Sequence, residues 1–388
     1  MSSKQTKIFN TAVIAKHFGF EIEKPCKVTK EDIKITKEAQ KDVGFLDDNL
    51  FPMEEAISIL KDYKKEEIDK DKIEPKLLYF EGSADGSHKK RRKKPNEEII
   101  NLHIVNVPKS IAEATIIKTA QTILAENGVK NICVKINDIG GKDAQTAFLR
   151  EATSYYRKNI NNMNVNCRQY FKDGVHTLTK KGKNQCSVVH EEAPKTMDFL
   201  GDDTRKHFSE VIEFLETMGI QYEIDPFVLG DQNYSSHTVF EIVDLDSNKV
   251  VAAGSRYNLL YKKIGTRKEI PAIGAVVNVP TPKIVSERLL SKVDNSKVFY
   301  MQLGYVAKLN SLKIIDDLRK NNIPVKQKIY RDKLSGQISA SKKSGAEHMI
   351  ITGQKEALEG TVILRDKEHR NQSVIEISKL AKTLKKLI

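Results

Sequence analysis

The chain has 388 residues, enough for two or three domains with a sizeable buried core. Its hydrophobic fraction of 39% and charged fraction of 30% are ordinary for a folded globular protein and exclude general disorder. No apolar run approaches the roughly 18 residues that cross a bilayer, and the N-terminus lacks the apolar core of a secretory signal. We therefore expect an intracellular, cytoplasmic protein with no membrane partner.

The net charge of +13 is concentrated near one end of the chain. From Lys297 onward there are 19 Lys and Arg against 9 Asp and Glu, which is a net +10. A second basic run comprises Lys89, Lys90, Arg91, Arg92, Lys93 and Lys94. A basic domain on a near-neutral body favours a polyanionic partner, of which nucleic acid is the usual one. The alternative is general solubilisation by lysine.

The four cysteines are Cys26, Cys133, Cys167 and Cys186. They form no CxxC pair, and their spacing suits neither a zinc finger nor a dense disulfide framework. We expect reduced, structural thiols and no metal site.

Hydrophobic periodicity predicts the first elements in chain order. Helices are expected over 8–22 and 53–63, and strands over 20–28 and 76–82, the former interrupted by a proline. The segment 83–98 is polar and reads as a loop. An alternating strand over 99–107, an amphipathic helix over 111–128 that ends at Gly128, and a β-branched strand over 131–138 follow.

The predicted secondary structure changes in kind along the second half of the chain. Residues 140–200 are partly helical and polar, and we interpret them as an insertion-like region. A helix over 204–219 precedes a β-hairpin whose turn is formed by residues 246–248. From 297 onward, strands at 298–304, 323–330 and 348–353 alternate with helices at 311–322 and 335–345. Two short strands and a basic helix end the chain, which indicates a compact α/β domain of about 90 residues.

Three stretches then resemble histidyl-tRNA synthetase, a class II aminoacyl-tRNA synthetase. TVFEI (238–242) followed by AGSRYNLL (253–260) and PAIGAVV (271–277) is similar to the family's TVFEI, GGGRYDGL and PAVGFAIG. Residues 111–138 resemble the family's helix and following strand. HMIITGQKEALEGTVILRD (348–366) is close to VIIGEDELANGTVTVKD in its C-terminal domain. HFGFEIEKPCKV (17–28) looks like the first class II motif, which implies that Pro25 packs at a dimer interface.

The resemblance implies an α+β fold in two parts. Residues 1–293 would form a class II synthetase-like antiparallel sheet with helices, including the insertion-like region at about 140–200. Residues 297–388 would form an anticodon-binding-like α/β domain. The boundary is expected near 293–297, a polar stretch with turn-forming residues.

The family's chemistry demands fixed cations, because a carboxylate attacks an anionic α-phosphate. At the three positions where the family places arginines, this chain has Asp85, Gly230 and Thr281. The family's PEGT region has also become PMEEAIS (52–58). These losses predict that adenylate formation is impaired and that no catalytic residue survives.

The resemblance leaves a remnant ligand pocket of Tyr234, Glu241, Arg256 and Tyr257. Arg256 is either a remaining ligand contact or a structural arginine, and we favour the structural role because the adjacent glycines have become Ala253 and Ser255. None of the nine histidines pairs with Cys, Asp or Glu at metal or triad spacing, and we treat His237 as incidental.

Candidate RNA contacts lie in two places. In the C-terminal domain they are Lys326, Lys328, Arg331, Lys333, Lys342 and Lys343, which we expect to touch phosphates mainly. The run from Lys89 to Lys94 is the second place. It could contact RNA backbone, replace lost arginines, or be a solvated tract.

The favoured hypothesis is a catalytically inactive, homodimeric histidyl-tRNA synthetase-like protein that binds tRNA or another structured RNA without a cofactor. The first alternative is a divergent active histidine–tRNA ligase, which would use ATP and Mg²⁺. Further alternatives are a synthetase-like regulatory subunit of a histidine-biosynthesis enzyme and a sensor of uncharged tRNA.

Overall fold

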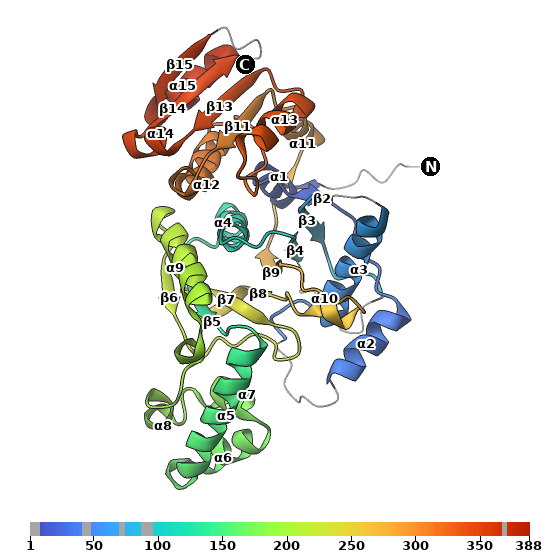
Figure 1. Ribbon diagram of the computed structural model, residues 1–388, viewed down its shortest axis with the longest axis vertical. Coiled ribbons are helices and arrows are strands. Elements are labelled where there is room, and N and C mark those ends of the chain that lie inside the picture. Colours follow the sequence, from blue (N-terminus) through green and yellow to red (C-terminus); the bar gives the residue numbers. More distant parts are fainter. Residues whose placement is uncertain (1–7, 41–47, 70–73, 87–95, 367–370) are drawn as a thin grey trace.

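A computed structural model describes residues 8–40, 48–69, 74–86, 96–366 and 371–388. The body is built on an eight-stranded sheet in the order β2-β3-β4-β9-β8-β7-β5-β6 (Figure 1). Its strands are β2 Glu21–Ile22, β3 Lys76–Glu81, β4 Glu97–Val105, β9 Ala272–Pro280, β8 Lys249–Arg256, β7 Ser236–Asp244, β5 Ile132–Asp138 and β6 Tyr222–Ile224. Neighbours from β3 to β5 pair antiparallel, whereas the two outermost pairs, β2–β3 and β5–β6, are parallel.

Helices cover both faces of this sheet. The helices α1 (Asn10–His17), α4 (Ile111–Glu126) and α9 (Asp202–Thr217) pack with it into the larger core cluster. On the other face lie α3 (Met53–Asp69) and α10 (Leu260–Lys263), which form the second cluster, with α2 (Lys30–Gln40) packed against α3. A two-stranded sheet of β1 (Ile8–Phe9) and β10 (Ile284–Val285) ties the two ends of the body together.

The helix α4 is buried around almost its whole circumference. Its threonines are tolerated there because each hydroxyl donates to the carbonyl four residues earlier, as Thr115 does to Ile111 at 2.6 Å and Thr119 to Thr115 at 2.7 Å. The one lysine that is buried on α4, Lys118, meets Asp316 of the C-terminal domain at 3.0 Å. The helix is therefore enclosed by both parts of the chain.

Residues 142–199 form a separate helical unit that projects from the body on the side away from the C-terminal domain (Figure 1). Its elements are α5 Lys142–Lys158, η1 Ile160–Asn162, α6 Val165–Lys172, α7 Val175–Gly182, α8 Ser187–Glu191 and η2 Thr196–Phe199. The unit has a hydrophobic cluster of its own. This is the segment that the sequence indicated only as an insertion-like region.

The C-terminal part follows a connecting helix, α11 (Glu287–Asp294), and contains a five-stranded sheet in the order β12-β11-β13-β14-β15. Its elements are β11 Val298–Gln302, α12 Tyr305–Lys320, β12 Lys326–Gln327, α13 Leu334–Ser344, β13 His348–Thr352, α14 Gln354–Glu359, β14 Thr361–Asp366, β15 Gln372–Glu376 and α15 Ile377–Leu387. Strand β11 is parallel to both its neighbours, and β14 and β15 are antiparallel additions.

The two parts share one hydrophobic core. Residues of α12 and β11, such as Leu312 and Tyr300, belong to the same buried cluster as Ile104 and Ile117 of the body. Polar contacts surround this shared core: Arg319 meets Glu126 at 3.1 Å, in addition to the pair made by Lys118. The C-terminal domain is thus docked on the body by a continuous apolar interface with ion pairs at its margin.

Several predicted elements are confirmed. The helix predicted over 111–128 is α4, with Gly128 at φ 100° behind it. The predicted hairpin is β7–β8, in which Asp244 pairs with Lys249. The α+β fold class is confirmed by the mixed sheet and the α/β C-terminal domain.

Several predicted elements are wrong in extent, including the strand expected over 20–28, of which only Glu21 and Ile22 form a strand, β2. The helix expected over 8–22 ends at His17, because Gly19 takes φ 92° and turns the chain into β2. The strand expected over 323–330 contains only the two residues of β12, since the Gln327 side chain accepts a hydrogen bond from the Ile329 N–H and diverts the backbone.

No helix in the described ranges is both long enough and apolar enough to cross a membrane.

Candidate functional site

The two tyrosines of the predicted remnant pocket lie on the sheet face covered by α3. Tyr234 is buried and donates a hydrogen bond to the Phe51 carbonyl at 2.6 Å. Tyr257 is fully buried, and its ring also packs on Phe51, with 5.3 Å between ring centroids. Both hydroxyls are thus engaged by the protein itself.

A histidine that the sequence did not single out lies at the centre of this group. The His103 imidazole, from β4, stacks on Phe80 at 5.8 Å and meets the Phe51 ring edge-on at 5.0 Å. Its Nδ1 lies 3.0 Å from the Tyr257 hydroxyl and its Nε2 lies 3.4 Å from the Glu55 carboxylate. We call Phe51, Phe80, His103, Tyr234 and Tyr257 the aromatic cluster.

The aromatic cluster is packed tightly against the sheet. A side-chain carbon at Gly274 of β9 would lie 2.5 Å from His103 Nδ1 and 2.9 Å from the Phe51 ring, so only glycine fits there. Burial together with the Glu55 carboxylate raises the pKa of Tyr257 well above its usual value. The hydroxyl therefore stays protonated and acts as a hydrogen-bonding group.

Arg256 lies in a buried ion pair with Glu113 of α4. Its guanidinium donates from Nη2 to Glu113 at 2.7 Å and from Nη1 to the Val107 carbonyl at 3.3 Å, and Nε also binds the carboxylate. His207 reaches the same carboxylate at 2.8 Å. Burial alone would raise the pKa of Glu113, but Arg256 and His207 outweigh it and lower that pKa to about 2.

The ion pair connects β8 to α4. All three guanidinium nitrogens of Arg256 donate to protein acceptors. These contacts support the structural reading of Arg256 over a ligand contact. Glu241 lies on β7 opposite Lys135 of β5 and Ala253 of β8, and it is half-buried. Arg256 therefore lies apart from Tyr234 and Tyr257, whereas Glu241 lies opposite Ala253, a member of the same hydrophobic cluster as the two tyrosines.

The three positions where the family has arginines differ in their surroundings. Gly230 takes φ 66°, and an added side-chain carbon there would lie 2.7 Å from the Ser235 hydroxyl. Thr281 follows β9, is exposed, and donates its N–H to the Asn96 carbonyl at 2.7 Å. Asp85 is exposed and pairs through its backbone with the segment around Lys27.

A buried carboxyl near Arg256 and Glu113 has a raised pKa. Asp138, at the end of β5, is buried and accepts the Gly140 N–H at 2.8 Å. Burial raises the pKa of Asp138 to about 7. His237 lies nearby with φ 51°, and burial lowers its pKa to about 4. No group of three His, Cys, Asp or Glu side chains placed to hold a metal ion occurs among the described residues.

The predicted RNA-binding residues of the C-terminal domain divide into two sets. Lys326, Lys328, Arg331 and Lys343 line a cleft of about 820 Å³ between the body and the C-terminal domain. Lys333 and Lys342 are exposed outside it. The basic run from Lys89 to Lys94 lies outside the described residues. Pro25 is exposed, as the neighbouring Lys24 is.

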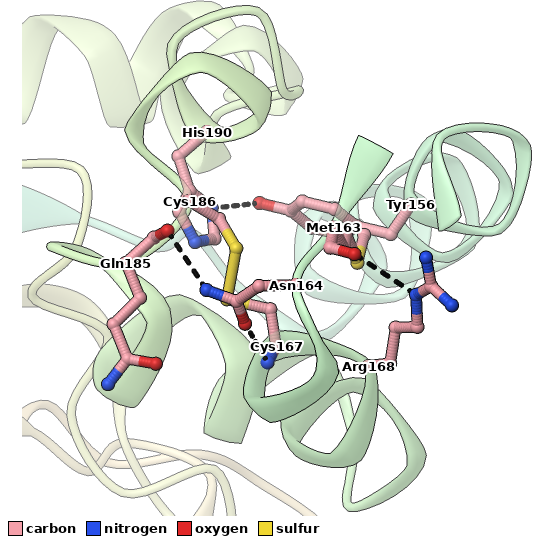
Figure 2. Close-up of a disulfide and its surroundings, with 8 residues drawn as sticks. All are labelled: Tyr156, Met163, Asn164, Cys167, Arg168, Gln185, Cys186 and His190. Atoms are coloured by element: carbon pink, nitrogen blue, oxygen red, sulfur yellow. Dashed lines mark hydrogen bonds between the residues drawn. A yellow bond between two sulfur atoms is a disulfide. The ribbon is translucent and has the colours of Figure 1, made fainter. Parts of the chain in front are cut away.

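The cysteines differ from expectation. Cys167 of α6 and Cys186, which precedes α8, form a disulfide inside the helical unit (Figure 2), whereas Cys26 and Cys133 are free. Both bonded sulfurs lie in the unit's hydrophobic cluster. The expectation of four reduced thiols is wrong for this pair, because the tertiary fold brings together two cysteines that are 19 residues apart.

Near the disulfide, the His190 imidazole is buried. Its Nδ1 lies 2.8 Å from the Tyr156 hydroxyl, and burial lowers its pKa (Figure 2). Asn164 caps α6 by accepting the Cys167 N–H at 2.8 Å, and its amide donates to the Gln185 carbonyl at 3.2 Å. The contacts of Asn164 therefore connect the same two segments as the disulfide.

Comparison with known proteins follows the same division of the chain. The family model described as "Histidyl-tRNA synthetase" matches residues 105–281, and the one described as "Anticodon binding domain" matches residues 301–387. The antiparallel sheet, with an anticodon-binding domain behind it, places the chain among class II aminoacyl-tRNA synthetases.

Curated relatives agree with the family models. A histidine–tRNA ligase of Fervidobacterium nodosum is 27% identical over 288 residues, covering 72% of this chain and 67% of the relative. One of Thermotoga maritima is 27% identical over 285 residues, covering 71% of this chain and 66% of the relative. The matched part thus spans about two thirds of each relative, and the chain is similar to histidine–tRNA ligases over most of its length.

Among solved structures, apo histidyl-tRNA synthetase of S. aureus is similar with a TM-score of 0.48 and 17% identity, over 96% of this chain and 93% of that one. Histidyl-tRNA synthetase of Nostoc sp. PCC 7120 gives a TM-score of 0.44 and 16% identity, over 100% and 99% of the two chains.

Proposed function

We propose that the chain is a catalytically inactive member of this family that binds tRNA or another structured RNA through its basic C-terminal domain. The observation that carries the proposal is the aromatic cluster. Tyr234 and Tyr257, the tyrosines that the family resemblance assigns to the ligand pocket, direct their hydroxyls to Phe51 and His103 instead. A substrate would have to displace buried, mutually packed rings.

The arginine positions support the same proposal. Adenylate formation brings two anionic groups together, and a fixed guanidinium relieves their repulsion. Gly230 has no room for a side chain beside Ser235, and Asp85 carries the wrong sign. Arg256, the one arginine retained in the Gly-rich turn, is neutralised by Glu113. The proposed protein needs no cofactor.

RNA binding is supported by the anticodon-binding match over 301–387 and by the net charge of +10 from Lys297 onward. We further propose that the protein works in the cytoplasm and forms a homodimer with Pro25 at the interface. The exposed position of Pro25 leaves it accessible to a second copy.

A divergent histidine–tRNA ligase is the second candidate. It is favoured by the curated relatives, which are histidine–tRNA ligases that match over 72% of this chain. In that case ATP and Mg²⁺ would be required, and the aromatic cluster would have to open.

The first test is aminoacylation of total tRNA with labelled histidine, run beside the Thermotoga maritima ligase. We expect no charging above the background without enzyme. Charging at a rate comparable to that ligase would reject the inactive reading and establish the second candidate.

The second test is filter binding of the same tRNA across a salt series. We expect the double variant K333A/K343A to weaken binding and to reduce the slope of log affinity against log salt by about 2. The matched control, K34A/K37A, removes two exposed lysines from α2 and should leave both unchanged. Point variants are preferred to deletion of 297–388, because that deletion would expose the shared core.

A further inference from the structure

The cleft between the two domains is bounded by an edge strand on each side. Strand β2 ends the body sheet, and β12 ends the C-terminal sheet. The cleft has a volume of about 820 Å³, with α13 forming one wall and α11 another. That volume is ample for a group of nucleotide size.

The rim of the cleft carries cations in two different states. Lys16 is paired with Asp294, and Arg331 with Glu74, so these four charges cancel. The remaining lysines of the cleft, Lys326, Lys328 and Lys343, have no carboxylate partner among the residues that the structure describes.

Lys343 is exposed on α13 and has no carboxylate partner in the described ranges. Lys328 likewise has none there, and its ammonium lies 5.6 Å from the centre of the Tyr330 ring. Within the described part of the chain, Lys326 donates to the Ser344 carbonyl at 2.8 Å and has no carboxylate partner. The lining also includes the Glu21 carboxylate of β2, so these three lysines leave a net positive charge in the cleft, where an anionic group would be stabilised.

The walls behind the lysines are largely apolar. Phe20 and Ile22 contribute from the body, Leu290 from α11, and Val325 and Ala340 from the C-terminal domain. An apolar slot behind a cationic rim suits a nucleotide, because the flat base can pack in the slot and the charged phosphate can bind the lysines. A paired RNA helix has no free base face to offer such a slot.

The cleft is preformed because a hydrogen bond links the two domains across it. The Gln327 side chain of β12 donates to the Phe18 carbonyl of the body at 3.1 Å. A side-chain carbon at Gly19, which takes φ 92°, would lie 2.5 Å from that same amide nitrogen. The close approach of Gln327 to the body therefore needs glycine at position 19. Because the two domains are already fixed, a ligand would have to order little of the protein when it binds.

We propose that this interdomain cleft binds a single unstacked nucleotide of an RNA loop, with the base between the two domains and its phosphate at Lys328 and Lys343. The inference rests on the proposed RNA binding and deepens it. Both domains would then contact the RNA. Binding would require an unpaired nucleotide at one position of the RNA.

The test compares an RNA hairpin with an unpaired loop and a continuous duplex of the same stem. Lys342 and Lys343 are adjacent exposed lysines on α13, but only Lys343 lines the cleft. We expect K343A to weaken hairpin binding about tenfold and K342A to weaken it by less than about threefold. Duplex binding should change equally little in both variants.

A steric variant tests the slot without removing charge. Ser339 is exposed on α13 and lines the cleft, whereas Ser335, one turn earlier, does not. We expect S339W to abolish the preference for the hairpin and S335W to preserve it. If S339W retains the preference, or if K342A and K343A weaken hairpin binding equally, the cleft is not the nucleotide site.

A fluorescence reporter separates this inference from the proposed function. The chain has no tryptophan, so Y330W places a single fluorophore beside Lys328 at the rim. Quenching by the hairpin that is lost in Y330W/K343A supports the inference. RNA binding without quenching overturns it while leaving the proposed function intact. Quenching by free guanosine monophosphate without any RNA binding supports a nucleotide site and rejects the RNA proposal.

Discussion

At the residue scale, His103 occupies the centre of the face where the family resemblance places a ligand pocket. Its imidazole is enclosed by aromatic rings and lies between the Glu55 carboxylate and the Tyr257 hydroxyl. The imidazole Nδ1 gives the buried Tyr257 hydroxyl a hydrogen-bonding partner at 3.0 Å, whereas Nε2 lies 3.4 Å from Glu55 without a hydrogen bond among the described residues. Loss of this one side chain should therefore reopen the space.

We expect H103A to lower the free energy of unfolding by about 3 kcal/mol, through the cavity and the unpaired groups left behind. Added imidazole should raise the melting temperature of H103A but not that of the wild type. The control H348A removes a half-buried imidazole of β13 outside the aromatic cluster and should show no imidazole effect. Wild-type stability of H103A would contradict this account.

Glu113 offers a second residue-scale prediction. The variant E113Q leaves the Arg256 guanidinium buried without its counter-charge, and we expect a loss of about 3–5 kcal/mol in denaturant unfolding. The control E151Q disrupts the exposed Arg150–Glu151 pair and should cost less than about 0.5 kcal/mol. Similar losses of unfolding free energy in E113Q and E151Q would argue that the Arg256 guanidinium is solvated rather than buried against Glu113.

At the element scale, the helical unit of residues 142–199 combines internal packing with polar contacts to the body, such as Lys183 with Asp225 and Thr196 with Asn137. It has its own hydrophobic cluster, and the disulfide joins α6 to the start of α8 within it. A crosslink that closes a loop of 19 residues stabilises mainly by restricting the unfolded chain. Its effect should accordingly be local to this unit.

We expect C167S to lower the stability of the oxidised unit by about 3 kcal/mol. Limited trypsin digestion should then cut near Arg168 and Lys172 first. Wild-type protein treated with dithiothreitol should show the same early cuts, whereas C133S, which removes a free buried thiol, should retain the wild-type pattern. A digestion pattern that is insensitive to both reductant and C167S would mean that the crosslink adds nothing.

Elements with strong periodicity could be predicted from the sequence, and those defined by tertiary contacts could not. The helix α4 and the β7–β8 hairpin follow directly from apolar spacing and turn residues. The short β12 depends on a side-chain hydrogen bond within its own turn, and α1 ends where Gly19 approaches a distant domain. Neither effect has a signature in local hydrophobicity.

The same limit applied to the candidate site. Spacing along the chain does not reveal the partners of the histidines, because His103 lies beside Glu55 and His207 beside Glu113, residues that are distant in sequence. The partner of Arg256 lies 143 positions away, on a helix that reads as an ordinary amphipathic one. Pairings of this kind are settled only when the sheet and helices assemble.

At the scale of the whole molecule, the interface between the domains contains a buried titratable group. His17 of α1 is largely buried, and burial together with Arg319 lowers its pKa from 6.5 to about 4. Lys292 acts in the same direction, while Asp316 opposes it. The folded protein therefore binds fewer protons at this site than the unfolded chain between pH 4 and 6.5.

It follows that His17 contributes stability that is fully present above pH 6.5 and is lost as the pH falls toward 4, by up to about 3 kcal/mol. We expect H17L to flatten the dependence of the melting temperature on pH across this window. The dependence should not vanish, because burial also lowers the pKa of His237 and His176 to about 4. An unchanged slope in H17L would exclude His17 as a source.

The continuous core described above also bears on how the chain is made. During synthesis α4 leaves the ribosome long before α12, the helix that covers its outer surface. The nascent body must therefore expose an apolar helix until the final domain has emerged. Emergence of α12, rather than completion of the body, is the event that lets this protein acquire its native state, and any premature stop before α12 should yield a product for chaperones and proteases to remove.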